Sequence, residues 1–193
     1  MWEVVHSKIK YAISVTVSAL CFFLFYYGVE YSFFRSIVSA ISLVTFLAFV
    51  IGKYLWKYIY FDALNKYLCP DLNGNWIAKI KSNFADRTNV VIPIKIEADF
   101  FSVRMFADTS FGQSEANYCR IFKSESDRFQ LEYMFQVRND SAGKGDAQFY
   151  EGAARLTLND ADNQLWKGVY WTNRCWNEGK NTAGEIELSR PKK

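Results

Sequence analysis

The chain has 193 residues, enough for one domain of ordinary size and a smaller second part. With 23 basic and 20 acidic residues the net charge is +3, which excludes the broad positive field typical of proteins that bind nucleic acid polymers. The single histidine is His6, so the rest of the chain offers no histidine for a catalytic triad or a multi-histidine metal site.

Two apolar runs near the N-terminus predict a membrane hairpin. Tyr11–Val29 holds 19 residues without a charge, and a helix of that length spans the roughly 30 Å core of a bilayer. The second run, Phe33–Ile51, is interrupted only by Arg35, which lies near enough to its start to reach the headgroups. A cleaved signal peptide is the alternative for the first run, but the run is too long and no small-residue cleavage site follows it.

The flanking charges predict the orientation of this hairpin. Lys8 and Lys10 precede the first run, and Lys53 and Lys57 follow the second. Because positive flanks stay on the cytosolic side, we expect both termini in the cytosol. The four cysteines lack zinc-ligand spacing, which agrees with free thiols in a reducing compartment and predicts no metal site.

Small residues at four-residue spacing mark both membrane runs. They are Ser14 with Ser18 in the first and Ser36 with Ala40 in the second. Such pairs let helices pack closely, either within the hairpin or between copies of the chain. The runs hold no buried ionisable group, which argues against a transport site.

A domain boundary is expected near residue 69. Residues 53–68 have the pattern of a helix that leaves the membrane, and Cys69-Pro70-Asp71 ends it. We therefore predict a helical part over residues 1–68 and a separate cytosolic ligand-binding domain over residues 69–193.

The second domain is predicted to be all-β. Its hydrophobic period is two, and turn residues divide it into eight runs: 75–81, 89–98, 101–107, 115–122, 128–137, 147–158, 165–176 and 182–188. Eight short-looped antiparallel strands favour an eight-stranded, up-and-down, lipocalin-like β-barrel that holds one small ligand. A two-sheet sandwich is the competing arrangement.

The alternation predicts which side chains face the barrel interior. The second and fifth runs have ordinary apolar faces, built on Ile92, Ile94 and Ile96 and on Leu131, Tyr133 and Phe135. The fourth, sixth and seventh runs place aromatic, small and cationic residues together, and the register of the third stays open. The candidate ligand-binding residues are Arg104, Tyr118, Arg120, Tyr133, Tyr150, Tyr170, Thr172, Arg174, Trp176, Asn181 and Thr182.

An arginine among rings on an inner face needs a carboxylate, carbonyls or an anionic ligand, because burial of an unpaired guanidinium is costly. Alternatively the strands that carry Arg120 and Arg174 are turned, and both arginines face solvent. If they face inward, the set suits a phosphorylated compound with bases, since rings stack on bases and arginine binds phosphate. No nucleotide-binding loop, zinc motif or activated nucleophile is present, so we expect neither an enzyme nor a cofactor.

The chain resembles the two-transmembrane, β-strand-rich effectors of bacterial CBASS anti-phage systems, which are associated with CD-NTase enzymes. The resemblance rests on the two helical runs, the opening Leu72–Trp76 and the closing hairpin Tyr170–Gly184, and the start Gly74-Asn75-Trp76 is also similar to that of lipocalins. It implies an antiviral effector in the bacterial inner membrane. A cyclic dinucleotide would bind the barrel, the chain would assemble into a homo-oligomer, and its helices would disrupt membrane lipids and kill the host cell.

Two other hypotheses belong to different classes. One is a membrane-anchored barrel that binds a fatty acid or lipid as carrier or sensor, for which an apolar interior with one arginine at the mouth would be suitable. The other is a scaffold whose packed barrel only recruits a partner protein.

Overall fold

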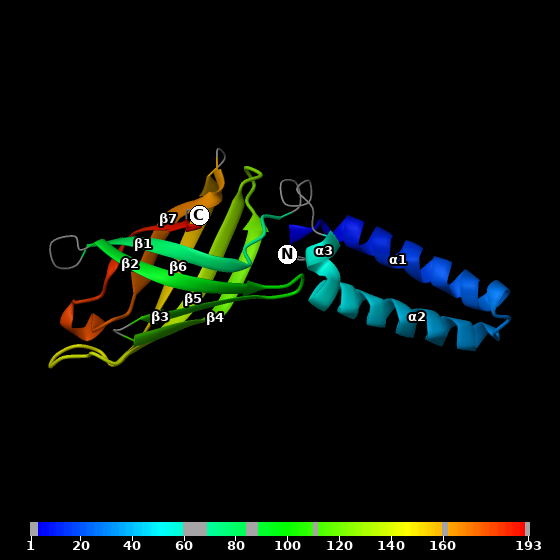
Figure 1. Ribbon diagram of the computed structural model, residues 1–193, viewed down its shortest axis with the longest axis horizontal. Helices are drawn as coiled ribbons and strands as arrows, with labels where there is room; N and C mark the ends of the chain where they lie inside the picture. The colour runs from blue at the N-terminus through cyan, green and yellow to red at the C-terminus, as the bar shows by residue number, and fades with distance from the viewer. Residues whose placement is uncertain (1–3, 60–68, 84–88, 110–111, 160–161, 192–193) are drawn as a thin grey trace. The chain divides into compact units, whose positions relative to one another are not determined.

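A computed structural model describes residues 4–59, 69–83, 89–109, 112–159 and 162–191 (Figure 1). The chain divides into two compact units. The first comprises residues 1–68 with 99–101, and the second comprises residues 69–98 with 102–193.

The first unit contains two long helices. α1 (Ser7–Phe23) continues through the π-turn η2 (Leu24–Gly28), and α2 (Phe33–Val50) continues through η3 (Ile51–Leu55) into α3 (Trp56–Ile59). By length and composition the helices over Ser7–Gly28 and Phe33–Ile59 are each able to cross a membrane. The predicted helix over 53–68 is seen as far as Ile59, and its remainder lies outside the described residues.

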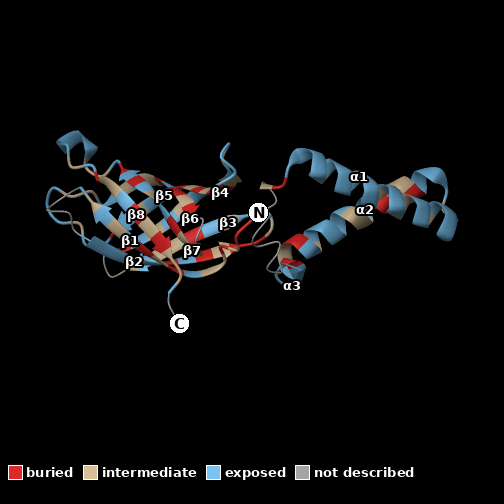
Figure 2. Cartoon of the chain, turned by 90° about the horizontal axis from the view of Figure 1, so that it is seen from above, coloured by how far each residue is buried: buried red, intermediate tan, exposed pale blue. Residues whose placement is uncertain are grey.

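The small residues of the second helix form its contact within the hairpin. Ser36 and Ala40 are buried, whereas Ser14 is exposed and Ser18 half-buried. The Ser36 hydroxyl donates to the carbonyl of Ser32 at 3.1 Å, so this polar group is satisfied within its own helix. Most other residues of the two helices are exposed (Figure 2), including large apolar ones. The pair on the second helix thus packs the hairpin, and contact between copies through the first pair stays a prediction.

The second unit is a closed eight-stranded barrel in which every strand is antiparallel to its neighbours and β8 pairs with β1. The predicted up-and-down barrel is therefore confirmed, and the sandwich is excluded. The strands are β1 (Gly74–Ser82), β2 (Asn89–Ala98), β3 (Val103–Thr109), β4 (Gly112–Lys123), β5 (Phe129–Asn139), β6 (Phe149–Asn159), β7 (Asp162–Thr172) and β8 (Ala183–Ser189).

The predicted inner faces of the second and fifth strands are confirmed. Ile94 and Ile96 are buried on β2, and Leu131 and Tyr133 are buried on β5. On β6 and β7 the register also matches the prediction: Ala154, Trp166, Tyr170 and Thr172 face inward and are buried.

Beyond its middle the fourth strand follows the alternative that the sequence left open, with Arg120 facing solvent, contrary to the place of Tyr118 and Arg120 among the candidate ligand-binding residues. Its pairing with β5 shifts between Ala116 and Tyr118, and this β-bulge reverses the alternation. Cys119 and Ile121 therefore turn inward, while Tyr118 and Arg120 are exposed on the outer surface. Burial raises the pKa of the Cys119 thiol to about 12, so this thiol stays protonated in the barrel wall.

The third strand resolves the register that the sequence left open. Met105 faces inward and is 3% exposed, so its neighbour Arg104 faces outward. Arg104 lies 3.2 Å from Glu97 of the adjacent strand, an exposed ion pair. Arg104 is therefore not on the inner face, contrary to its place among the candidate ligand-binding residues.

Candidate ligand-binding site

One end of the barrel is sealed by the chain itself. Trp76 on β1 is 1% exposed, and its indole nitrogen donates to the carbonyl of Leu72 at 2.7 Å. The guanidinium of Arg190 lies 4.7 Å from the centre of the Trp76 ring and donates to the carbonyl of Asp71 at 2.8 Å. Trp76 and Arg190 together therefore close this end of the barrel.

The opposite end carries the β5–β6 and β7–β8 loops, and an ion pair joins them. Arg174, just beyond β7, donates from Nε to Asp146 Oδ1 at 2.7 Å and from Nη2 to Asp146 Oδ2. Asp146 also accepts bonds from the Asn139 amide at 3.0 Å and from the Ala147 backbone at 2.8 Å. The Arg174 guanidinium is the largest cause that lowers the pKa of Asp146. The arginine is thus held by a carboxylate in a bidentate geometry that a phosphate also fits.

An aromatic ring lies beside the arginine. The Arg174 guanidinium carbon is 5.3 Å from the centre of the Tyr150 ring, within the range of a cation–π contact. Tyr150 is half-buried on β6, and burial raises the pKa of its hydroxyl. The tyrosine therefore stays neutral at physiological pH and can donate a hydrogen bond.

Below the ion pair the inner wall combines rings with small residues. Tyr133 on β5 and Tyr170 on β7 are both opposite Ala154 of the strand between them, so the three form one row across the sheet. In the next row toward the loops Gly152 lies between Phe135 and Thr172. A methyl group on Gly152 would come within 2.4 Å of the Phe135 ring, so only glycine fits beneath this ring.

Two buried threonines form the last polar feature of the wall. The hydroxyls of Thr172 and Thr182 lie 2.7 Å apart, and the Thr182 backbone nitrogen donates to Thr172 Oγ1 at 3.3 Å. The Arg174 backbone nitrogen also donates to Thr172 Oγ1, at 3.4 Å. This network fixes the start of the segment that carries the arginine.

The structure brings together five of the eleven predicted residues around the loop end of the interior: Tyr150, Tyr170, Thr172, Arg174 and Thr182. Tyr133 lies deeper on the same inner surface and is buried. Asn181 is exposed in the loop before β8.

Trp176 does not face the interior, contrary to its predicted place in the seventh strand. β7 ends at Thr172, and Cys175 adopts the left-handed conformation with φ 45°, so the alternation stops before Trp176. The tryptophan lies in the short helix η4 (Trp176–Glu178) and is 72% exposed.

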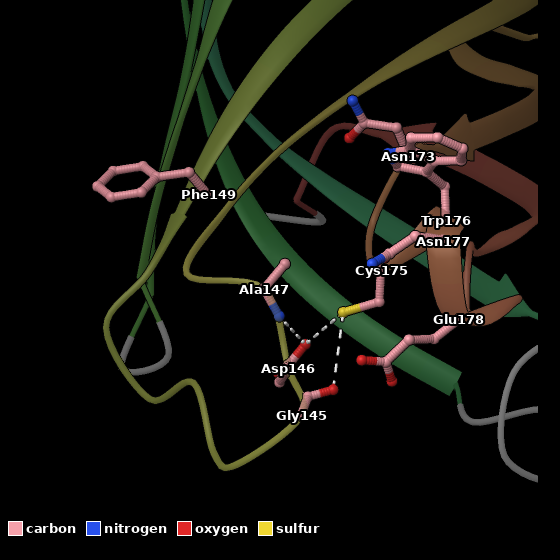
Figure 3. A pocket seen from close by; sticks show the side chains of 9 residues that line it. All are labelled: Gly145, Asp146, Ala147, Phe149, Asn173, Cys175, Trp176, Asn177 and Glu178. Atoms are coloured by element: carbon pink, nitrogen blue, oxygen red, sulfur yellow. Dashed lines mark hydrogen bonds between the residues drawn. The ribbon is translucent and has the colours of Figure 1, made fainter.

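A recess of about 340 Å³ lies between this helix and the β5–β6 loop (Figure 3). Asp146, Cys175, Trp176 and Glu178 are among its lining residues, and the Cys175 sulfur lies 3.8 Å from the carbonyl of Gly145. Because Asp146 also binds Arg174, the recess adjoins the ion pair.

Asp146 is the residue of this candidate site that the sequence did not predict. It lies between the predicted strands 128–137 and 147–158, in a segment that the sequence predicts only as a turn. The predicted topology could have indicated it. In an up-and-down barrel the fifth and seventh loops lie at the same end, so Asp146 before the sixth strand and Arg174 after the seventh lie at that same end.

The fold and site define a class: a small closed β-barrel with one sealed end and, at its loop end, an arginine–aspartate pair beside aromatic rings. A search against protein-family models matches residues 67–190 to the Cap15 cyclic dinucleotide receptor domain. A curated protein of Escherichia albertii, CD-NTase-associated protein 15, is 50% identical over 190 residues, covering 98% of each chain. The chain therefore belongs to the Cap15 cyclic dinucleotide receptor family, as the resemblance predicted.

Proposed function

We propose that this protein is an antiviral effector whose cytosolic barrel binds a cyclic dinucleotide at its loop end. The observation that carries the site is the bidentate Arg174–Asp146 pair beside Tyr150. A cyclic dinucleotide presents two phosphates and two bases, which match a planar guanidinium and inward-facing rings.

Binding requires an exchange of partners at the arginine. Asp146 occupies the position of an anionic ligand on the Arg174 fork, so a phosphate has to compete with this carboxylate. Displacement of Asp146 would free the β5–β6 loop from the β7–β8 side. The ligand would thereby change the conformation of these loops and leave the sealed end as it is. It can shift the protein to this rearranged state only if it binds that state more tightly than the state with the Arg174–Asp146 pair.

The membrane step is the second part of the proposal. We place the two apolar helices in the bacterial inner membrane with both termini in the cytosol, because lysines flank the outer ends of the hairpin. Ligand binding would drive homo-oligomer formation, and the assembled helices would disrupt membrane lipids and kill the infected cell. The role is binding rather than catalysis.

The test uses full-length protein in detergent, titrated by calorimetry with cyclic di-GMP, cyclic di-AMP and cyclic GMP–AMP. We expect saturable binding of at least one compound, with linear dinucleotides as controls. Palmitate is the control for the fatty-acid carrier, which would bind through the apolar interior instead. Binding of palmitate with no response to any cyclic dinucleotide would reject the proposal.

Topology is tested separately with reporter fusions. Fusions at the N-terminus and after Lys193 should both report a cytosolic position. A periplasmic signal from either end would contradict the orientation and would remove the barrel from a cytosolic messenger.

A further inference from the structure

The outer surface of β4–β7 carries a row of apolar side chains that the ligand site does not use. Tyr118 is opposite Met134, Met134 is opposite Ala153, and Ala153 is opposite Trp171 on β7. Residues opposite each other in antiparallel strands share a face, so the four form one row across the sheet. Tyr118, Met134 and Trp171 are 46%, 55% and 48% exposed.

Charges of opposite sign flank this row on its two sides. On the side toward the loop end, β4 and β6 present the exposed carboxylates of Glu115 and Glu151, each opposite Gln136. On the other side the same two strands present the exposed guanidinium groups of Arg120 and Arg155, each opposite Glu132, to which Arg155 Nε donates at 2.5 Å, so this row keeps a net positive charge. Both flanking rows lie two residues from Met134 along β5, a distance of about 7 Å.

The two charged rows and the apolar row between them are complementary to the same rows of a second copy related by a two-fold axis. Consider a second copy related by a two-fold axis that lies between the two facing sheets and runs along the apolar row. The rotation leaves each strand opposite its own copy and exchanges the two flanking rows. Glu115 then faces Arg120 of the second copy, and Glu151 faces Arg155 of the second copy, while each apolar residue meets its own equivalent.

We propose that the outer face of β4–β7 is a self-association surface, and that its occupant is a second copy of this chain in the two-fold arrangement described. This deepens the proposed function, because it supplies a surface for the homo-oligomer on which that function rests. An anionic membrane is the less suitable occupant, since on β4–β6 the three carboxylates in these rows, Glu115, Glu132 and Glu151, outnumber the two arginines.

The central test is cross-linking of full-length protein in detergent at Met134, which the axis brings against its own copy. Cys21 and Cys175 are first replaced by Ser, and Met134→Cys is compared with Val91→Cys, a position on β2 that is 62% exposed. We expect disulfide-linked dimers from Met134→Cys at least about tenfold above those from Val91→Cys. Equal cross-linking at the two positions would overturn the proposal.

Charge reversal then tests the arrangement of the two copies. A plus variant carries Glu115→Arg and Glu151→Arg, and a minus variant carries Arg120→Glu and Arg155→Glu, each with Met134→Cys. Like charges then face each other in homodimers, so each variant alone should cross-link about tenfold less than the parent. A mixture of the two should cross-link like the parent, because every facing pair is again of opposite sign.

A matched control carries the same added charge outside the face, as Glu185→Arg and Glu187→Arg on β8. It should cross-link like the parent, and circular dichroism verifies that every variant is folded. If the minus variant does not fold, the dimer yields of the plus variant and of this control are still compared, and that comparison alone tests the arrangement. A plus variant that cross-links as well as the control would overturn the proposal.

Cross-linking is scored with and without the three cyclic dinucleotides, and calorimetry is run on the same samples. Intact binding without the Met134 cross-link would overturn this surface and leave the proposed function standing. Cross-linking without any nucleotide binding would support the surface and reject the proposed function. Protection of Met134→Cys from maleimide by phosphatidylglycerol vesicles, without cross-linking, would assign the face to lipid and overturn the proposal.

Discussion

The two ends of the barrel differ in the kind of side chain that they bury. At the sealed end, large side chains such as Trp76, Trp166 and Leu188 are almost fully buried. At the loop end, by contrast, several buried or half-buried groups are polar and are held by one another, as Thr172 is by Thr182 and Arg174 by Asp146. Burial of apolar area dominates stability, whereas exchangeable polar partners suit binding. Changes at the sealed end should therefore act mainly on the free energy of unfolding, and changes at the loop end mainly on the affinity for ligand.

The largest effect is expected at the sealed end. Trp76→Ala removes a side chain that is 1% exposed, breaks its bond to Leu72 and leaves Arg190 without its ring. We expect a loss of about 3–5 kcal/mol in the free energy of unfolding. Urea denaturation of full-length protein in detergent, followed by near-ultraviolet circular dichroism, measures it. A loss below about 1 kcal/mol would show that this end does not carry the stability assigned to it.

The second prediction concerns the loop end. Arg174→Ala removes the charge-assisted contact available to a phosphate, so cyclic dinucleotide binding should weaken by roughly 1.5–3 kcal/mol, or about ten- to a hundredfold. Arg174→Lys should recover only part of this affinity, because lysine lacks the planar fork. Calorimetry measures both, and Arg104→Ala, on the outer surface, is the matched control. Equal affinity for Arg174→Ala and parent would exclude this arginine from the site.

The sequence predicted the strand pattern better than it predicted the side chains at the site. Strict alternation on β2 and β5 fixed their inner faces, because one apolar set has to be buried. The bulge after Ala116 has no such signal, since Tyr118, Arg120 and their neighbours fit either face. Asp146 was missed for a different reason: its role depends on a residue 28 positions away, and no local pattern encodes that pairing.

The third prediction concerns the pH dependence of the ion pair. The pKa of Asp146 is lowered in the folded state, so its ionised form stabilises the fold above the ordinary aspartate pKa of about 4. This contribution is lost as the pH falls through the lowered pKa. The difference in unfolding free energy between parent and Asp146→Asn should be constant above about pH 5 and should shrink below pH 4. Denaturation curves between pH 3 and pH 7 measure it, and a difference that grows on acidification would contradict the pairing.

The smallest expected effect separates two tryptophans within the sealed end. Trp76 Nε1 donates to Leu72, whereas Trp166 Nε1 is buried without a partner among the described residues. Both changes to Phe remove similar volume, but Trp76→Phe also leaves the Leu72 carbonyl without its donor, while Trp166→Phe removes a donor that was already unsatisfied. Trp76→Phe should therefore cost about 1 kcal/mol more in unfolding free energy than Trp166→Phe, measured by the same urea denaturation. An equal or reversed order would mean that Trp166 Nε1 finds an acceptor in solution, such as a buried water, and that polar groups at the sealed end are satisfied as fully as those at the loop end.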